Sequence, residues 1–63
     1  MMRANLQPSD FGHVLKSWRA ARRISQLELS LAARVSQRHI SWLETGRSHP
    51  SRGMVLQLAE ALD

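Results

Sequence analysis

Cysteine is absent from this sequence of 63 residues, and long apolar runs are absent as well. Without cysteine the chain has no disulfide, no thiolate zinc site and no cysteine nucleophile. A core this small then depends on good helix packing or on a partner. The longest apolar runs, residues 31–33 and 54–56, are too short for a membrane span or for the core of a signal peptide. We therefore predict a single soluble domain located in the cytoplasm.

Acidic residues are scarce. The chain has five of them against nine basic residues, which gives a net charge of +4 and a sequence pI near 11.5. The imbalance is greatest over residues 34–52, where Glu44 is the only acid among several arginines and histidines. An excess of positive charge concentrated in one stretch favours an anionic polymer as the partner.

The sequence also lacks the usual signs of catalysis and metal binding. His13, His39 and His49 do not have the i, i+4 spacing of a helical ligand pair, and neither a Gly-rich phosphate loop nor an HExxH-like segment occurs. No nucleophile, base and orienting group stand out together. We therefore expect no enzymatic activity, no metal site and no cofactor.

The first predicted helix follows Ser9, a candidate N-cap. Its apolar residues have the spacing of one helix face: Phe11, Val14, Leu15 and Trp18. We expect this helix to end at residue 22 or 23. Residues 1–8 have no periodic apolar pattern and are expected to form a flexible N-terminal arm, so the folded domain is expected to span residues 9–63.

Two short helices separated by a three-residue turn are predicted next. Ser25 and Glu28 have the spacing of a capping box at the start of the second helix. Ser36 is a good N-cap for the third helix, predicted over residues 36–45, and Gly46 is a typical stop. Two helices joined by so short a turn must cross steeply, which is the arrangement of a helix-turn-helix.

A fourth helix is predicted after Ser51, with an apolar stripe of Val55, Leu58 and Leu62, and we expect it to continue to the last residue. No strand alternation or internal repeat occurs, so the predicted fold is all-α. The predicted core is made of Val14, Leu15, Trp18, Ile24, Leu29, Ala33, Ile40, Leu43, Val55, Leu58 and Leu62.

Residues 25–29 and 35–51 resemble the Cro/repressor helix-turn-helix family, often called XRE. Within that family, residues 37–52 and 54–63 are most similar to the DNA-binding domains of actinobacterial-type regulators that carry a MmyB-like ligand-binding domain. The resemblance implies a compact four- to five-helix, lambda-repressor-like fold and sequence-specific binding of double-stranded DNA by a transcriptional regulator. The family usually has glycine at the position of Arg34, where the backbone is often left-handed, and arginine there costs roughly 1 kcal/mol.

The resemblance implies that the helix of residues 36–45 reads the major groove with its N-terminal residues. Glutamine pairs bidentately with adenine and arginine with guanine. Trp42 lies one turn after Arg38, and either a core position or contact with the DNA is compatible with a tryptophan there. We expect partial exposure at the DNA-facing edge, against a thymine methyl group. The expected base-contacting residues are Gln37, Arg38, Ser41 and Trp42.

Phosphate contacts are implied for the elements that flank this helix. Gln26 matches the family position where a side chain and a helix N-terminus meet a phosphate. Such contacts position the protein without reading sequence. The expected phosphate-contacting residues are Gln26, Ser36, His39, Arg47, Ser48, His49, Ser51 and Arg52, although simple exposure is almost as good an interpretation for His39.

Glu44 requires a partner, because an acid in a DNA-facing region is unfavourable unless it is paired. The resemblance implies a structural ion pair with Arg19. The alternative is an exposed i, i+3 contact with Arg47, which is worth only ~0.3 kcal/mol. We expect the pair with Arg19.

A helical protein-interaction module or an antitoxin-like partner domain is the alternative function. RNA is disfavoured because a recognition helix cannot enter the deep, narrow groove of A-form RNA. Domains of this family usually add a fifth helix, so we expect the fourth helix to be covered by a homodimer partner or by a further segment after residue 63. The expected partner is double-stranded DNA.

Overall fold

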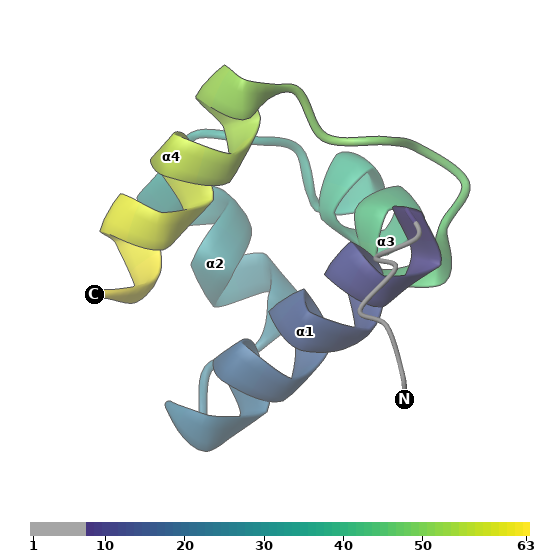
Figure 1. Cartoon of the computed structure of the whole chain (residues 1–63). Coiled ribbons are helices and arrows are strands. Elements are labelled where there is room, and N and C mark those ends of the chain that lie inside the picture. Colours follow the sequence, from purple (N-terminus) through teal and green to yellow (C-terminus); the bar gives the residue numbers. More distant parts are fainter. Residues whose placement is uncertain (1–7) are drawn as a thin grey trace.

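The computed structural model describes residues 8–63, which contain four helices and no strand (Figure 1). The helices are α1 (Pro8–Ala21), α2 (Gln26–Ala33), α3 (Gln37–Thr45) and α4 (Arg52–Leu62). The all-α prediction is confirmed for this part of the chain. The predicted N-terminal arm lies outside the described residues, apart from Pro8.

The predicted boundaries of α1 were wrong by one or two residues at each end. The helix begins at Pro8, because proline is well suited to the first helical position, and Ser9 therefore lies inside the helix instead of capping it. The helix ends at Ala21. Arg23 has a φ of 57°, in the left-handed region, so the chain leaves the helix before the residue that we expected to end it.

The caps of α2 and α3 form as predicted. Ser25 Oγ accepts a hydrogen bond of 3.0 Å from the Glu28 N–H, and the Glu28 carboxylate accepts one of 2.7 Å from the Ser25 N–H, which completes the capping box. Ser36 Oγ accepts from the His39 N–H at 3.0 Å. Each cap satisfies an N–H group that would otherwise have no partner in the first turn.

Arg34 occupies the turn between α2 and α3 with a φ of 61° and a ψ of 43°. This is the left-handed conformation that the family resemblance implies, held by hydrogen bonds from the N–H groups of Arg34 and Val35 to the Ser30 carbonyl. Left-handed backbone is normally a position for glycine, because a Cβ atom is crowded there.

Replacing Arg34 with glycine is expected to raise the free energy of unfolding by up to about 1 kcal/mol, since the crowding of Cβ is removed. The greater freedom of glycine in the unfolded chain offsets part of this gain. Urea denaturation followed by circular dichroism measures the difference. Arg34→Ala is the matched control, because it removes the charge and keeps Cβ. A glycine variant less stable than the alanine variant would contradict the prediction.

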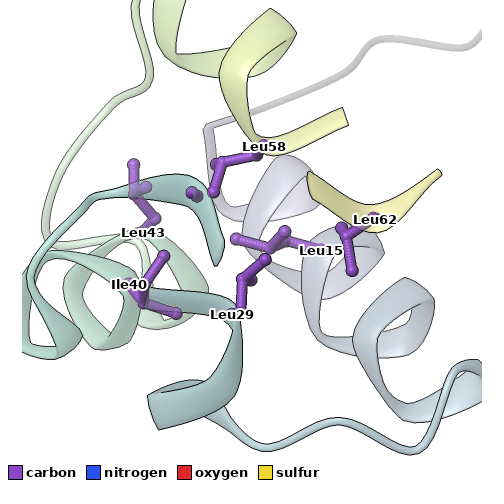
Figure 2. Packing of buried hydrophobic residues seen from close by; sticks show 7 residues of the cluster. Leu15, Leu29, Ile40, Leu43, Leu58 and Leu62 are labelled. Atoms are coloured by element: carbon purple, nitrogen blue, oxygen red, sulfur yellow. The ribbon is translucent and has the colours of Figure 1, made fainter. Parts of the chain in front are cut away.

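The core is formed by seven residues from all four helices, none more than 3% exposed: Leu15, Leu29, Ala33, Ile40, Leu43, Leu58 and Leu62. Figure 2 shows Leu15 of α1 among leucine and isoleucine side chains of the other helices. Ile24 is half-buried and packs against this cluster, as do Phe11 and Met54. Eight of the eleven residues in the predicted core therefore lie in the core or against it.

Three residues of the predicted core are exposed, and those predictions were wrong. Val14 is 52% exposed, and Trp18 and Val55 are each 36% exposed. Each lies at the side of the apolar face of its helix. The centre of that face is Leu15 in α1 and Leu58 in α4. Within the predicted α4 stripe, Leu58 and Leu62 are covered by their own chain and are 1% exposed, whereas Val55 has no such cover.

Gly12 permits a close approach between α1 and α3 that the sequence analysis did not anticipate. It is buried, and a Cβ atom added to it would lie 2.4 Å from the Leu43 carbonyl oxygen and 2.6 Å from that of Glu44. The beginning of α1 therefore lies directly against the C-terminal backbone of α3 (Figure 1). A glycine inside a helical pattern was the available signal, since glycine there costs about 1 kcal/mol relative to alanine.

Candidate nucleic-acid interface

Helix α3 has one buried side and one outward side. Ile40 and Leu43 are fully buried and fix the helix against the core. Gln37 and Arg38 are exposed in its first turn. Trp42 is 39% exposed, which agrees with the partial exposure expected for it and excludes a core position. Ser41 is half-buried. The structure thus brings the four predicted base-contacting residues together on α3, outside the core.

Thr45 also lies on this outward side and was not part of the predicted site. It is exposed, and its hydroxyl donates a hydrogen bond of 2.9 Å to the Ser41 carbonyl. Its position four residues after Ser41 was the signal that could have found it, since residues at i and i+4 share a helix face.

Arg19 and Glu44 form the implied ion pair through two parallel hydrogen bonds. Arg19 Nε donates to Glu44 Oε2 at 2.8 Å, and Nη2 donates to Oε1 at 3.1 Å. The remaining nitrogen, Nη1, donates to the Ile24 carbonyl at 2.9 Å. The Glu44 side chain is only 3% exposed and that of Arg19 15%. The pair therefore ties α3 to α1 and to the loop that follows α1.

Gln26 has a role that was not predicted. Its Nε2 donates to Glu44 Oε1 at 3.0 Å, so the first residue of α2 is fixed to the carboxylate of α3. A glutamine amide carries two N–H donors. One is used by Glu44, and the other remains for the predicted phosphate contact.

The surroundings of Glu44 keep it ionised. Burial raises the pKa of this carboxyl, but the hydrogen bonds from Arg19 and Gln26, together with the charges of Arg19 and Lys16, lower it more, so its pKa lies below its ordinary value. The hydrogen bond to Glu44 raises the pKa of the Arg19 guanidinium in spite of its burial. The only acid of residues 34–52 is thus covered and neutralised, and it does not oppose the positive charges around it.

The predicted phosphate-contacting residues lie at the start of α2, at the cap and in the first turn of α3, and between α3 and the first residue of α4. Ser36, Arg47, His49, Ser51 and Arg52 are exposed, and Gln26, His39 and Ser48 are half-buried. The hydroxyl oxygens of Ser36 and Ser51 accept cap hydrogen bonds at 3.0 and 3.1 Å. An accepting hydroxyl still has its own O–H to donate, so the caps leave both residues able to contact a phosphate.

Two further structural features bear on the class of site. Among residues 8–63, no group of three or more His, Cys, Asp and Glu side chains is arranged to hold a metal ion. Within the same range, no helix is both long enough and apolar enough to cross a membrane.

Residues 10–63 match the family described as a helix-turn-helix domain. The chain belongs to this helix-turn-helix family. A relative from Sinorhizobium fredii, the uncharacterized HTH-type transcriptional regulator y4dL, is 41% identical over 54 residues. The match covers 81% of this chain and 28% of the relative, so the helix-turn-helix domain spans well under half of that protein.

Two solved structures have the same fold as this helix-turn-helix domain. The clp gene regulator ClgR from C. glutamicum is 34% identical with a TM-score of 0.86, and the match covers 94% of this chain and 77% of ClgR. The restriction-modification controller protein C.AhdI from Aeromonas hydrophila is 30% identical, also with a TM-score of 0.86, and the match covers 89% of this chain and 85% of C.AhdI. These matches confirm the lambda-repressor-like fold and a DNA-binding domain of the Cro/repressor type, not an enzyme.

Proposed function

We propose that this domain binds double-stranded DNA sequence-specifically as part of a transcriptional regulator, with α3 in the major groove. The observation that carries the proposal is the surface of α3, where Gln37 and Arg38 face solvent while the nearby acid, Glu44, is covered by Arg19. The major groove of B-DNA is wide enough for one helix. The relatives are described as a transcriptional regulator, a gene regulator and a controller protein, which supports the same role and a location in the cytoplasm, at the nucleoid.

Base contacts are assigned to the outward side of α3. Gln37 is suited to adenine and Arg38 to guanine, because each can make two parallel hydrogen bonds to the edge of that base. Trp42 is assigned to a thymine methyl group, since its ring is the exposed apolar surface of this helix. Ser41 is assigned to a base edge as well, because a serine hydroxyl can contact either kind of base.

Phosphate contacts are assigned to the flanking elements. Gln26 is held by Glu44 at the N-terminus of α2, where the helix dipole favours an anion. Ser36 and His39 belong to the first turn of α3 and its cap. Arg47, Ser48, His49, Ser51 and Arg52 lie between α3 and the first turn of α4. These residues position the domain on the DNA backbone.

Two measurements test the function. The first is the binding of a fluorescent duplex at increasing salt, and the second is the selection of bound sites from a pool of random duplexes. Each phosphate neutralised by the protein releases counterions, so the binding constant should fall steadily as salt rises. Double-stranded RNA of the same length should compete poorly, because α3 cannot enter its deep groove. Equal competition by RNA, or a selected pool without any common motif, would contradict the proposal and favour the protein-interaction alternative.

Replacing Arg38 with alanine is expected to remove discrimination at one base pair, worth about 1–3 kcal/mol. Arg52→Ala is the control, because it should weaken binding to all duplexes similarly and reduce the slope against salt by about one. Site selection with each variant measures the difference. If the Arg38 variant selects the same motif as the unaltered domain, Arg38 does not read a base.

Association with a second copy, or cover by a segment after residue 63, stays a prediction. Helix-turn-helix proteins that bind as dimers read two half-sites one helical turn apart. Of the predicted stripe, Val55 is exposed and available for such a contact. Two residues outside that stripe are available as well: Trp18 and Leu56 line a hollow between α1 and α4 together with Ala59, and Leu56 is 61% exposed. The similarity to MmyB-like regulators also remains a prediction.

A further inference from the structure

Three exposed side chains at the outward side of α3 form one group, which we call the arginine–tryptophan cluster: Arg38, Trp42 and Arg47. The guanidinium carbon of Arg38 lies 5.9 Å from the centroid of the Trp42 ring, and that of Arg47 lies 5.6 Å from it. Both distances are within the ~6 Å over which a cation is attracted to an aromatic face. One indole therefore attracts two guanidinium groups.

The local backbone holds this cluster together. Arg38 precedes Trp42 by about one helical turn, so the two side chains are neighbours on the helix surface. Gly46 has a φ of 82°, which turns the chain back at the end of α3. The Arg47 N–H then donates to the Trp42 carbonyl at 2.8 Å. Arg47 is thus anchored beside Trp42 by a backbone hydrogen bond that does not depend on the ring contact.

The cluster joins two residues with different roles in the proposed function, since Arg38 is assigned to a base and Arg47 to a phosphate. Two like charges repel each other, and each arginine loses rotamer freedom when it binds. An aromatic face attracts both guanidinium groups and restricts them before DNA arrives. Such preorganisation strengthens binding mostly by reducing the entropy lost in the complex.

We propose, on the basis of the proposed function, that Trp42 is a positioning residue that couples base reading by Arg38 to phosphate contact by Arg47. Arg47 then differs from Arg52, which makes no ring contact in the described part of the chain. Arg52→Ala weakens the binding of all duplexes equally. Arg47→Ala also reduces the preference for the selected duplex, by about 2- to 5-fold, the range of one exposed cation–π contact.

A double-mutant cycle tests the coupling. The proteins are the unaltered domain, Arg38→Ala, Arg47→Ala and the double variant. The probes are a duplex selected by the unaltered domain and a duplex of unrelated sequence. The cycle is repeated with Trp42→Phe, which keeps an aromatic ring, and with Trp42→Leu, which keeps only an apolar surface.

We expect the effect of the double arginine variant on the binding constant to differ by about 2- to 5-fold from the product of the two single effects. Trp42→Phe should retain part of this coupling and Trp42→Leu none. Independent effects in the unaltered domain, or full coupling with leucine, would overturn the proposal.

A measurement without DNA separates the cluster from the proposed function. The chain has two tryptophans, so Trp42 is the only indole in a Trp18→Phe background. We expect acrylamide to quench Trp42 fluorescence more strongly after Arg38→Ala or Arg47→Ala, because one guanidinium no longer covers the ring. Arg52→Ala is the control, and quenching in that variant should be the same as in the domain with all three arginines. Unchanged quenching in both arginine variants overturns the cluster and leaves DNA binding standing. Equal binding of all duplexes by the unaltered domain overturns the proposed function and, with it, the coupling.

Discussion

Replacing Arg19 with alanine is expected to lower the free energy of unfolding by about 3–5 kcal/mol, because Glu44 is left as a buried charge without its partner. The Glu44 side chain is only 3% exposed, and Arg19 supplies two of its three hydrogen bonds. Small domains have free energies of unfolding of only about 5–15 kcal/mol, so much of the variant should be unfolded well below the transition temperature of the unaltered domain. Urea and thermal denaturation followed by circular dichroism measure the loss.

The effect of Arg19→Ala should depend on pH. The pKa of Glu44 in the folded chain lies below its ordinary value of 4.5, so its ionised form stabilises the fold above pH 4.5, and this contribution is lost as the pH falls through the folded pKa. The variant lacks the arginine that lowers this pKa. The stability difference between the two proteins should therefore be largest near neutral pH and shrink below about pH 4.5.

Arg22→Ala is the matched control for this prediction. It removes one positive charge from the chain beyond α1, and its guanidinium is exposed, 5.5 Å from the Trp18 ring. An exposed cation–π contact is worth about 0.5–1 kcal/mol, so the control should lose no more than that. If both variants lose the same amount, or if the difference between Arg19→Ala and the unaltered domain does not vary with pH, the ion pair does not hold α1 to α3 as described.

Replacing Gly12 with alanine is expected to destabilise the domain by about 3 kcal/mol, the upper part of the range for overpacked cores. The added Cβ would lie 2.4 and 2.6 Å from two carbonyl oxygens at the end of α3, and backbone atoms cannot rotate away as the end of a flexible side chain can. Helix α1 must then move away from α3. Because Glu44 lies at this contact, the shift should also strain its bonds to Arg19.

Gly53→Ala is the matched control, because it makes the same substitution in α4, where the nearest atom to the added Cβ is Ser51 Oγ at 3.9 Å. Alanine is the better helix former, so this variant should be more stable than the unaltered domain by about 0.5–1 kcal/mol. The two changes are thus expected to have opposite signs in the same denaturation experiment. Equal effects would show that α1 does not approach the α3 backbone closely at Gly12.

The helix starts and stops after α1 were predictable because they depend on neighbouring residues. Ser25, Ser36 and Ser51 each accept a hydrogen bond from an N–H group three residues later, and Gly46 takes the left-handed conformation that ends α3. A cap is decided within one turn of the chain, so the order of side chains is enough to find it. The start of α1 was misplaced because proline and serine are adjacent there, and both favour a helix N-terminus.

The candidate site was predictable in its position on α3 and not in its contacts. The resemblance to the Cro/repressor family indicated the recognition helix and the ion pair of Arg19 with Glu44. It did not indicate that Gln26 also binds Glu44, or that Arg38 and Arg47 both approach Trp42. These contacts depend on side-chain directions and on the path of the chain after Gly46, which helical periodicity does not describe.

Local order in the chain was therefore sufficient for the four helices, for the caps of α2, α3 and α4, and for the apolar positions at the centre of each face, such as Leu15 and Leu58. Tertiary packing alone decided the edges of those faces: Val14, Trp18 and Val55 have apolar side chains at helical spacing, yet they stay 36–52% exposed beside the buried residues of the same helices. Packing also decided that Gly12 is the point where α1 approaches the backbone of α3. The spacing of residues along one helix shows which side is apolar, whereas the width of the side that becomes buried depends on the distance and angle of its neighbours.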